Sequence, residues 1–212
     1  DEYLFSHEEE NRPAPLTAAS VGSYGAYLAD GSEYRGDYGK TREELADFHR
    51  ERIHILAEAG PDVFACETIP CLVEALAETD VLSEIPGAEA WISFSCKDGL
   101  HTCGGDLISD CAKALKDIKE VAAIGINCTA PQYVESLIKE IVKVTDKPVV
   151  VYPNSGEDYD AGSKSWEGSV AKYEDYVKIW YEAGARLIGG CCRTGPEDIR
   201  KVAAFRKSLI EK

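Results

Sequence analysis

The chain has 212 residues, of which 44% are hydrophobic and 29% charged, a composition typical of a globular protein that can bury one core. Its formal net charge of -15 disfavours nucleic acid and anionic membrane surfaces as partners, because both are negatively charged. No run approaches the ~20 apolar residues of a membrane-spanning helix, and the acidic residues 1–11 do not resemble a targeting signal. Eight cysteines in a chain of this size indicate reduced thiols and a cytoplasmic location.

Six short apolar runs, rich in β-branched residues and bounded by turn residues, predict strands that are buried on both faces. They cover residues 16–22, 63–68, 90–96, 121–128, 148–154 and 186–192. Segments with helical periodicity separate them. Strands that alternate with helices predict right-handed βαβ crossovers and a parallel sheet. Because no linker or composition break divides the chain, we expect residues 1–212 to form a single domain.

The helical segments carry their own start signals. Thr41 and Glu44 form a predicted capping box, in which each side chain satisfies a backbone amide of the first turn. Pro70 and Pro196 are expected to begin later helices, where the missing N–H has no consequence. The helix after Thr41 is predicted to bury one apolar face: Leu45, Phe48, Ile55, Leu56 and Ala59.

Two α/β architectures fit this alternation: an open doubly wound sheet, or a (β/α)8 barrel of the TIM type with six of its eight βα units visible. A dinucleotide-binding doubly wound fold requires a glycine-rich phosphate loop after its first strand. Residues 22–25 lack the third glycine of that loop and are followed by tyrosines, with no helix expected there. No P-loop is present either. The barrel is therefore favoured.

In parallel α/β folds, functional residues gather at the carboxyl ends of the strands. A carboxylate, two amides and several thiols occupy those ends in this sequence. They are Glu67, Asn127, Cys128, Asn154, Cys191 and Cys192. We expect them to lie along one rim, which makes them the candidate site residues.

Thiols on one rim suggest a zinc site, since thiolate is a soft ligand that Zn²⁺ accepts readily. Neighbours on a straight strand point in opposite directions, so Cys191 and Cys192 can share a metal only if the chain turns there. The glycines at 189 and 190 allow that turn. The spacing alone leaves open a packed or redox-active cysteine pair. A second, weaker cluster is Cys96, His101 and Cys103.

The segment 23–40 is long and unusually rich in tyrosine and acid. Its tyrosines and carboxylates are Tyr24, Tyr27, Tyr34, Tyr38, Asp30, Glu33 and Asp37. Proteins hold onium cations with aromatic faces and carboxylates, so Tyr24 and Asp30 are candidate contacts of a cationic substrate. An ordered surface loop with packed tyrosines is the alternative interpretation.

Several motifs together resemble one family. Residues 189–196 (GGCCRTGP) and 125–128 (GINC) resemble the two metal-ligand motifs of homocysteine S-methyltransferases. Residues 18–38 (AASVGSYGAYLADGSEYRGDY) are similar to the branch that uses S-methylmethionine as methyl donor, and residues 67–70 and 151–157 match further blocks. The resemblance covers nearly the whole chain in the expected order.

The resemblance implies a (β/α)8 barrel that binds Zn²⁺ through Cys128, Cys191 and Cys192. It implies methyl transfer from S-methylmethionine or S-adenosylmethionine to the thiol of L-homocysteine, giving methionine, with no general base beyond the metal. Glu67 resembles the acid that receives the amino group of the substrate. The oligomeric state is not indicated.

Alternatives remain open at this point. Betaine-dependent and cobalamin-dependent relatives share the metal motifs, and a non-catalytic zinc-thiolate scaffold would also carry them. Members of the family begin with two further βα units to which nothing here corresponds, so we expect an N-terminal part to be missing. A barrel without those units would expose two unpaired sheet edges.

Overall fold

The computed structural model describes residues 14–160, 165–167 and 173–210, so the acidic N-terminal segment lies outside the described residues. All six predicted strands are present, and they form one parallel sheet. The strands are β1 (Ala18–Gly22), β2 (Val63–Ile69), β3 (Ala90–Phe94), β4 (Val121–Asn127), β5 (Val149–Tyr152) and β8 (Ala185–Ile188). The α/β class predicted from the alternation is confirmed.

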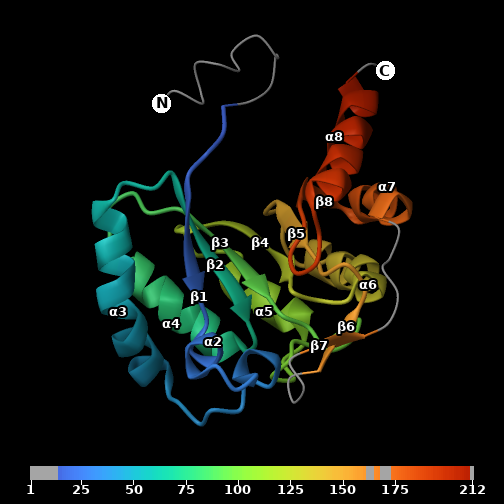
Figure 1. Ribbon diagram of the computed structural model, residues 1–212. Coiled ribbons are helices and arrows are strands. Elements are labelled where there is room, and N and C mark those ends of the chain that lie inside the picture. The colour runs from blue at the N-terminus through green and yellow to red at the C-terminus, as the bar shows by residue number, and fades with distance from the viewer. Residues whose placement is uncertain (1–13, 161–164, 168–172, 211–212) are drawn as a thin grey trace.

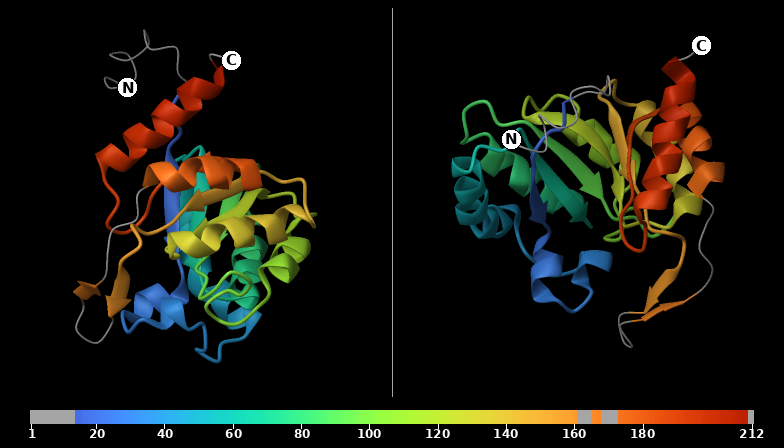
Figure 2. Two further views of the ribbon diagram at one scale, coloured as in Figure 1. Left: turned by 90° about the vertical axis from the view of Figure 1, so that its right-hand side faces the viewer. Right: turned by 45° about the horizontal axis from the view of Figure 1, so that its top comes forward.

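The order of the strands in the sheet is β1-β2-β3-β4-β5-β8, which is their order along the chain. A doubly wound sheet reverses its strand order at a switch point, and none occurs here. Figure 2 shows the strands as an open, curved sheet, with the larger helices along its outer side. Singly wound order with helices outside is the arrangement of a (β/α)8 barrel, here represented by six strands.

Helices connect the strands, and a short hairpin precedes the helix before the last strand (Figure 1). The helices are α2 (Tyr24–Leu28), α3 (Arg42–Glu58), α4 (Leu72–Leu82), α5 (Ile108–Leu115), α6 (Pro131–Val142), α7 (Tyr173–Ala183) and α8 (Pro196–Ile210), with a 3₁₀ turn η2 (Ser32–Tyr34). The hairpin pairs β6 (Asp158–Asp160) with β7 (Ser165–Glu167) in antiparallel register. In the part of the chain that the structure describes, no helix is long and apolar enough to cross a membrane.

Two expectations about helix starts were wrong. The segment after β1 does begin with a helix, α2, because the buried hydroxyl of Ser23 accepts a hydrogen bond from the Ala26 amide and caps it. Helix α4 begins at Leu72 and not at Pro70. The Pro70 carbonyl instead accepts a hydrogen bond of 2.7 Å from the Gly104 amide, which keeps this residue in the rim loops.

Helix α3 starts with the predicted capping box between Thr41 and Glu44. Its buried face was predicted only in part: Leu45 is buried and Leu56 packs against the core, but Ile55 is 59% exposed and Ala59 is exposed. The buried residues are Leu45, Ala46, His49 and Ile53. Leu45, His49 and Ile53 follow one another at four-residue intervals, so they share one face. The buried stripe therefore includes a histidine, which hydropathy alone assigns to the surface.

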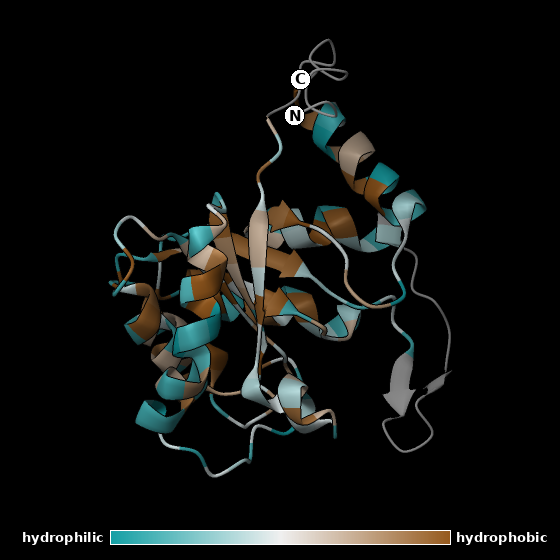
Figure 3. Cartoon of the chain, turned by 60° about the vertical axis from the view of Figure 1, so that its left-hand side comes forward, coloured by the Kyte–Doolittle hydropathy of each residue, from teal (hydrophilic) through white to brown (hydrophobic). Residues whose placement is uncertain are grey.

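One cluster of buried residues extends from β1 to β8, and Figure 3 shows the hydrophobic residues gathered along the inner strands. The prediction of burial on both faces holds for the inner strands but not for β1 and β8. Each of these two pairs with a single strand, and Ala18 in β1 and Leu187 in β8 are exposed. Among the described residues, the sheet thus has two open edges, as expected for a barrel represented by six strands.

Candidate metal centre

Three thiols meet at the carboxyl ends of β4 and β8. The sulfur of Cys128 lies 2.8 Å from that of Cys191 and 3.9 Å from that of Cys192, and the sulfurs of Cys191 and Cys192 are 3.8 Å apart. All three cysteines are free and partly buried. The structure therefore brings together the three thiols that the sequence placed on one rim.

The backbone turns sharply at both strand ends to achieve this. Cys128 has a left-handed conformation, with φ of 45°, directly after the last residue of β4. On the other side, the Cys191 amide donates to the Pro153 carbonyl (2.9 Å), and the Thr194 hydroxyl donates to the Cys191 carbonyl (2.7 Å). A Cβ at Gly190 would lie 2.3 Å from the Thr194 hydroxyl oxygen, so this turn requires glycine.

The donor set suits a metal ion. Tetrahedral zinc with Zn–S bonds of about 2.3 Å separates its sulfur ligands by about 3.8 Å. The two separations that involve Cys192 match that value, while the Cys128–Cys191 separation is shorter yet well beyond a disulfide bond of about 2.05 Å. The three ligand atoms form a group that could hold a metal. Three protein ligands leave one tetrahedral position for another molecule.

The thiols share their protons unevenly. Hydrogen bonds from Cys128 and then Cys191 lower the pKa of Cys192. The hydrogen bonds with Cys191 and then Cys192, followed by burial, raise the pKa of Cys128. One thiolate is thus stabilised by two neighbouring thiols. A cation is the group that lets all three lose their protons, because it replaces sulfur–sulfur repulsion with attraction.

Asn127, a sequence-predicted substrate contact, is buried and bonded to Thr68 at the end of β2. Its side-chain oxygen accepts from the Thr68 amide and its side-chain nitrogen donates to the Thr68 hydroxyl, both at 2.8 Å. Thr68 has φ of 61°, an uncommon value for a β-branched residue. Its hydroxyl also lies 3.7 Å from the Cys128 sulfur. The pair thus links the end of β2 to the thiol group.

Glu67 lies one residue earlier, inside the curve of the sheet. Its carboxylate accepts a 2.6 Å hydrogen bond from the hydroxyl of Ser20 in β1. Burial, and then the charge of Glu67, raise the pKa of the Tyr152 phenol. Tyr152 in turn accepts from the indole of Trp91 at 3.0 Å. Glu67 is therefore a half-buried carboxylate that neighbouring hydroxyl groups hold in place.

Asn154 lies in the loop that follows β5 and is 8% exposed. Its backbone N–H donates to the Thr129 carbonyl at 3.0 Å. Its side-chain oxygen is buried and has no hydrogen-bond partner among the described residues. A buried acceptor without a partner is uncommon, and it marks a place where a ligand can donate a hydrogen bond.

Tyr24 is held by its own segment and by α3, and Asp30 by its own segment. The Tyr24 ring packs edge-to-face on Tyr38 and Phe48, and Asp30 accepts from the Ser32 amide at 3.0 Å. A different residue of the same segment faces the thiols: burial, and then the charges of Cys128 and Cys192, raise the pKa of Tyr34. Sequence reasoning named Tyr34 only as one tyrosine among several, because composition does not show which one reaches the rim.

The weaker cysteine cluster does not assemble. His101 forms an ion-pair contact with Asp98 at 3.0 Å, and Cys96 is buried with its amide bonded to Thr129. Within the described ranges, the groups spaced for a metal are the three rim cysteines and a second set made of His49, Glu74 and Glu78. The second set lies between α3 and α4 and was not predicted.

The comparisons with known proteins agree with this geometry. A family model described as homocysteine S-methyltransferase matches residues 5–205. The chain belongs to the homocysteine S-methyltransferase family. The homocysteine S-methyltransferase YbgG of Bacillus subtilis is 55% identical over 99% of this chain and 67% of its own length. Homocysteine S-methyltransferase 2 of Arabidopsis thaliana is 52% identical, over 93% of this chain and 60% of its own length.

A solved structure of the family supports the fold. The homocysteine methyltransferase MmuM of Escherichia coli, in a metallated form, superposes with a TM-score of 0.84 at 41% identity. The match covers 96% of this chain and 65% of the MmuM chain. The predicted TIM-type barrel is thereby confirmed. The chain spans about two thirds or less of the length of these relatives.

Proposed function

We propose that this chain is the main part of a zinc-dependent enzyme that transfers a methyl group from a sulfonium donor to the thiol of L-homocysteine. The observation that carries the proposal is the group of Cys128, Cys191 and Cys192, three thiols at one rim that could hold a metal ion. Membership of the family, whose relatives are named for homocysteine methylation, supports the substrate.

A zinc ion bound by the three cysteines supplies a Lewis acid that keeps the homocysteine sulfur as a thiolate near neutral pH. Glu67 accepts the substrate amino group as a charge-assisted hydrogen bond, oriented by Ser20. The unpartnered oxygen of Asn154 accepts a further N–H. Thr68 and Asn127 hold the end of β2 against Cys128. These side chains bind and orient the nucleophile.

The donor is S-methylmethionine or S-adenosylmethionine, both of which carry a positively charged sulfur. The thiolate sulfur forms a bond to the methyl carbon while the bond from that carbon to the donor sulfur breaks, and its electron pair stays on the donor sulfur. The products are methionine and a second thioether, so the negative charge on the attacking sulfur and the positive charge on the donor sulfur both disappear. No proton moves in this step. The thiol proton would leave to solvent earlier, when homocysteine binds, because a bound zinc ion would lower the pKa of that thiol, so no general base beyond the metal is required.

The segment 23–40 is the proposed donor site, since it brings acidic and aromatic groups to the rim. Besides Tyr24 and Asp30, it offers Tyr34, whose pKa responds to the thiol charges, and Glu33. One carboxylate oxygen of Glu33 is buried and has no hydrogen-bond partner in the described part of the chain. A desolvated carboxylate and aromatic faces suit an onium cation.

We further infer that residues 1–212 belong to one homocysteine-binding domain of a cytoplasmic enzyme. All eight cysteines are free, which fits a reducing compartment. Neither nucleic acid nor a membrane is a proposed partner, because the net charge is -15.

The proposal is tested on the full-length protein, purified without added metal. We expect about one zinc per chain and transfer of labelled methyl from S-methylmethionine to homocysteine. Cys191→Ser should lose most of the zinc and nearly all transfer while remaining folded. Transfer only from betaine or methylcobalamin would identify another donor branch. Zinc that keeps its ligand set when homocysteine is added would identify a structural scaffold instead.

A further inference from the structure

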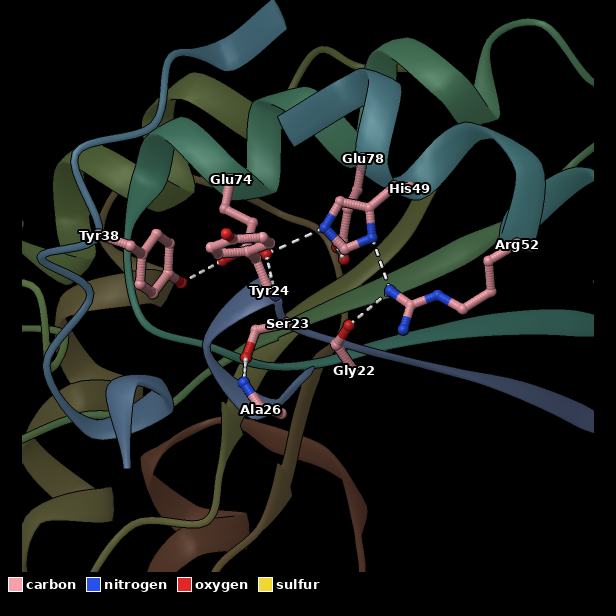
Figure 4. A network of polar contacts seen from close by, with 9 residues as sticks. All are labelled: Gly22, Ser23, Tyr24, Ala26, Tyr38, His49, Arg52, Glu74 and Glu78. Atoms are coloured by element: carbon pink, nitrogen blue, oxygen red, sulfur yellow. Dashed lines mark hydrogen bonds and ion pairs between the residues drawn. The ribbon is translucent and has the colours of Figure 1, made fainter. Parts of the chain in front are cut away.

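A buried polar network joins α3, α4 and the segment after β1 (Figure 4). Glu74 in α4 and His49 in α3 are both 0% exposed, and the His49 Nε2 lies 2.9 Å from a Glu74 oxygen. On the other side of the ring, Arg52 Nη2 lies 2.7 Å from His49 Nδ1 and donates to the Gly22 carbonyl at 2.7 Å. Arg52, His49 and Glu74 thus form a chain of hydrogen bonds from the end of β1 to the buried side of α4.

The arginine determines where the histidine proton lies. A guanidinium can only donate hydrogen bonds, so His49 Nδ1 must accept and cannot carry a proton. The proton is therefore on Nε2, which donates it to Glu74. His49 is neutral and relays a hydrogen bond from a cation to an anion.

This arrangement excludes His49, Glu74 and Glu78 as a metal site, although their ligand types fit one. A histidine bound to metal through Nε2 carries its proton on Nδ1 and gives it to an acceptor, but here a guanidinium occupies that place.

Glu74 accepts hydrogen bonds from both ends of one segment. Its Oε1 accepts from the Tyr24 amide at 2.5 Å as well as from His49, and its Oε2 accepts from the Tyr38 hydroxyl. A carboxylate suits this position because it only accepts, and here it meets three donors. Residues 24 and 38 enclose the part of the chain that contains α2 and η2.

The enclosed residues extend to the metal centre. The Glu33 carbonyl accepts a 2.8 Å hydrogen bond from Ser95 at the end of β3, and Tyr34 lies within the electrostatic influence of Cys128 and Cys192. The base of the segment is therefore fixed on Glu74, while its middle lies near the thiols of Cys128 and Cys192.

We propose that Glu74, oriented by His49 and Arg52, is a positioning residue that holds segment 23–40 in the conformation that binds the methyl donor. The inference rests on the proposed function, because it concerns the donor side of that reaction. Glu74 does not touch the substrate; it fixes both ends of the segment that does. Apolar packing at such a position is often as stable as a buried ionic network, so we attribute the network in this protein to conformational specificity.

The test is Glu74→Gln in the full-length enzyme. A glutamine nitrogen must replace one carboxylate oxygen. It either faces the Tyr24 N–H and His49, which loses hydrogen bonds, or faces the Tyr38 hydroxyl, which must then accept in place of donating; the charge that strengthens these bonds is lost in both cases. We expect the KM for S-methylmethionine to rise at least about tenfold, with the KM for homocysteine and the zinc content within about twofold of wild type. Amide hydrogen exchange of residues 23–40 should become faster, while that of β4 and β8 should not.

The matched control is Glu84→Gln. Glu84 follows α4 and contacts Arg50 (3.1 Å) and His54 (3.0 Å) of α3, so it joins the same two elements, but at the surface and away from the segment. This variant should match wild type in both KM values. The positioning role is wrong if Glu74→Gln has the same KM values as Glu84→Gln. It is also wrong if both KM values and the zinc content of Glu74→Gln change together.

Three further variants keep the inference testable if Glu74→Gln does not fold. Tyr38→Phe removes a single hydrogen bond and should raise the donor KM about fivefold. His49→Gln can accept from Arg52 and donate to Glu74, so it should stay near wild type, whereas His49→Leu should behave like Glu74→Gln. Equal donor KM values for these two would disprove the relay.

Failure of the proposed function would be visible separately. If the wild-type enzyme transfers no methyl from any sulfonium donor, the reaction is wrong, and the inference then depends on hydrogen exchange alone. Faster exchange confined to residues 23–40 in Glu74→Gln supports the anchoring, and unchanged exchange there overturns it.

Discussion

Asn127 and Thr68 bind each other through two hydrogen bonds of 2.8 Å, and this reciprocal pair holds Thr68 in a left-handed conformation beside Cys128. A non-glycine residue with such a φ angle costs about 1–3 kcal/mol, which the surrounding contacts must offset. The pair therefore has a structural task next to the thiols, in a position where the sequence suggested a substrate contact.

Replacing Asn127 should test which of these tasks dominates. Asn127→Leu leaves Thr68 without its partner, so we expect Cys128 to shift and zinc affinity to fall about 10–100-fold, as for other groups that orient metal ligands. Asn127→Asp keeps the acceptor for the Thr68 amide, so its zinc affinity should fall less than that of Asn127→Leu. Zinc affinity is measured by competition with a chelator. A raised homocysteine KM with unchanged zinc affinity would instead make Asn127 a substrate contact.

Glu67 should matter mainly for homocysteine. Glu67→Gln removes the charge that would meet the amino group, a loss of about 1.5–3 kcal/mol, so the homocysteine KM should rise roughly 10–150-fold. Ser20→Ala removes only the hydroxyl that orients Glu67 and should raise the homocysteine KM by about fivefold or less. Steady-state kinetics with each substrate varied in turn measures both. An unchanged homocysteine KM in Glu67→Gln would remove Glu67 from the site.

The turn before the cysteine pair offers a comparison of two glycines. Gly190→Ala would place a Cβ 2.3 Å from the Thr194 hydroxyl oxygen, so Thr194 must move and release the Cys191 carbonyl. We expect weaker zinc binding without global unfolding, because the turn lies at the rim. Gly195→Ala meets no heavy atom within 4 Å and is the control. Equal zinc affinity of the two variants would show that the close approach does not position Cys191.

The strands and the thiol group could be predicted from sequence because their signals are local. β-branched runs such as the one in β5 mark strands directly, and parallel order brings their ends together, so Cys128 and Cys191 had to share a rim. The turn at Gly190 could be inferred from residue type alone. The barrel was predicted over the doubly wound sheet because a glycine motif is missing from the sequence. The strand order of the sheet agrees with that prediction.

What could not be predicted depends on contacts between segments that are distant in sequence. His49 is polar, and its burial depends on hydrogen-bond partners for both ring nitrogens, one of which is the carboxylate of Glu74, 25 residues away. Helix α2 has five residues, too few for a periodic signal. The segment after β1 offered several tyrosines, and composition does not show that Tyr24 is bonded to Glu74 whereas Tyr34 lies near the thiols.

Glu78 gives a prediction about stability and pH. It is 0% exposed, and neither of its oxygens has a hydrogen-bond partner in the described part of the chain, although one lies 3.5 Å from His49. Burial, and then the charge of Glu74, raise its pKa well above the ordinary 4.5, while contacts with Cys66 and Arg52 act in the opposite direction. In the native protein Glu78 is therefore a neutral acid at pH values where the unfolded chain has lost that proton.

The sign of the effect follows from proton binding. Above about pH 4.5 the native state binds one more proton at Glu78 than the unfolded state, so this group lowers the free energy of unfolding by about 1.4 kcal/mol per pH unit, until the pH reaches the native pKa. Glu78→Gln removes this titration with little change in shape. We expect it to be about as stable as wild type at pH 4 and more stable at pH 7, measured by urea unfolding.

Glu84→Gln is the control, because the hydrogen bond from His54 lowers the pKa of Glu84 and its contribution has the opposite sign. A stability difference that is the same at both pH values, or wild type more stable at pH 7, would mean that Glu78 is ionised in the native protein.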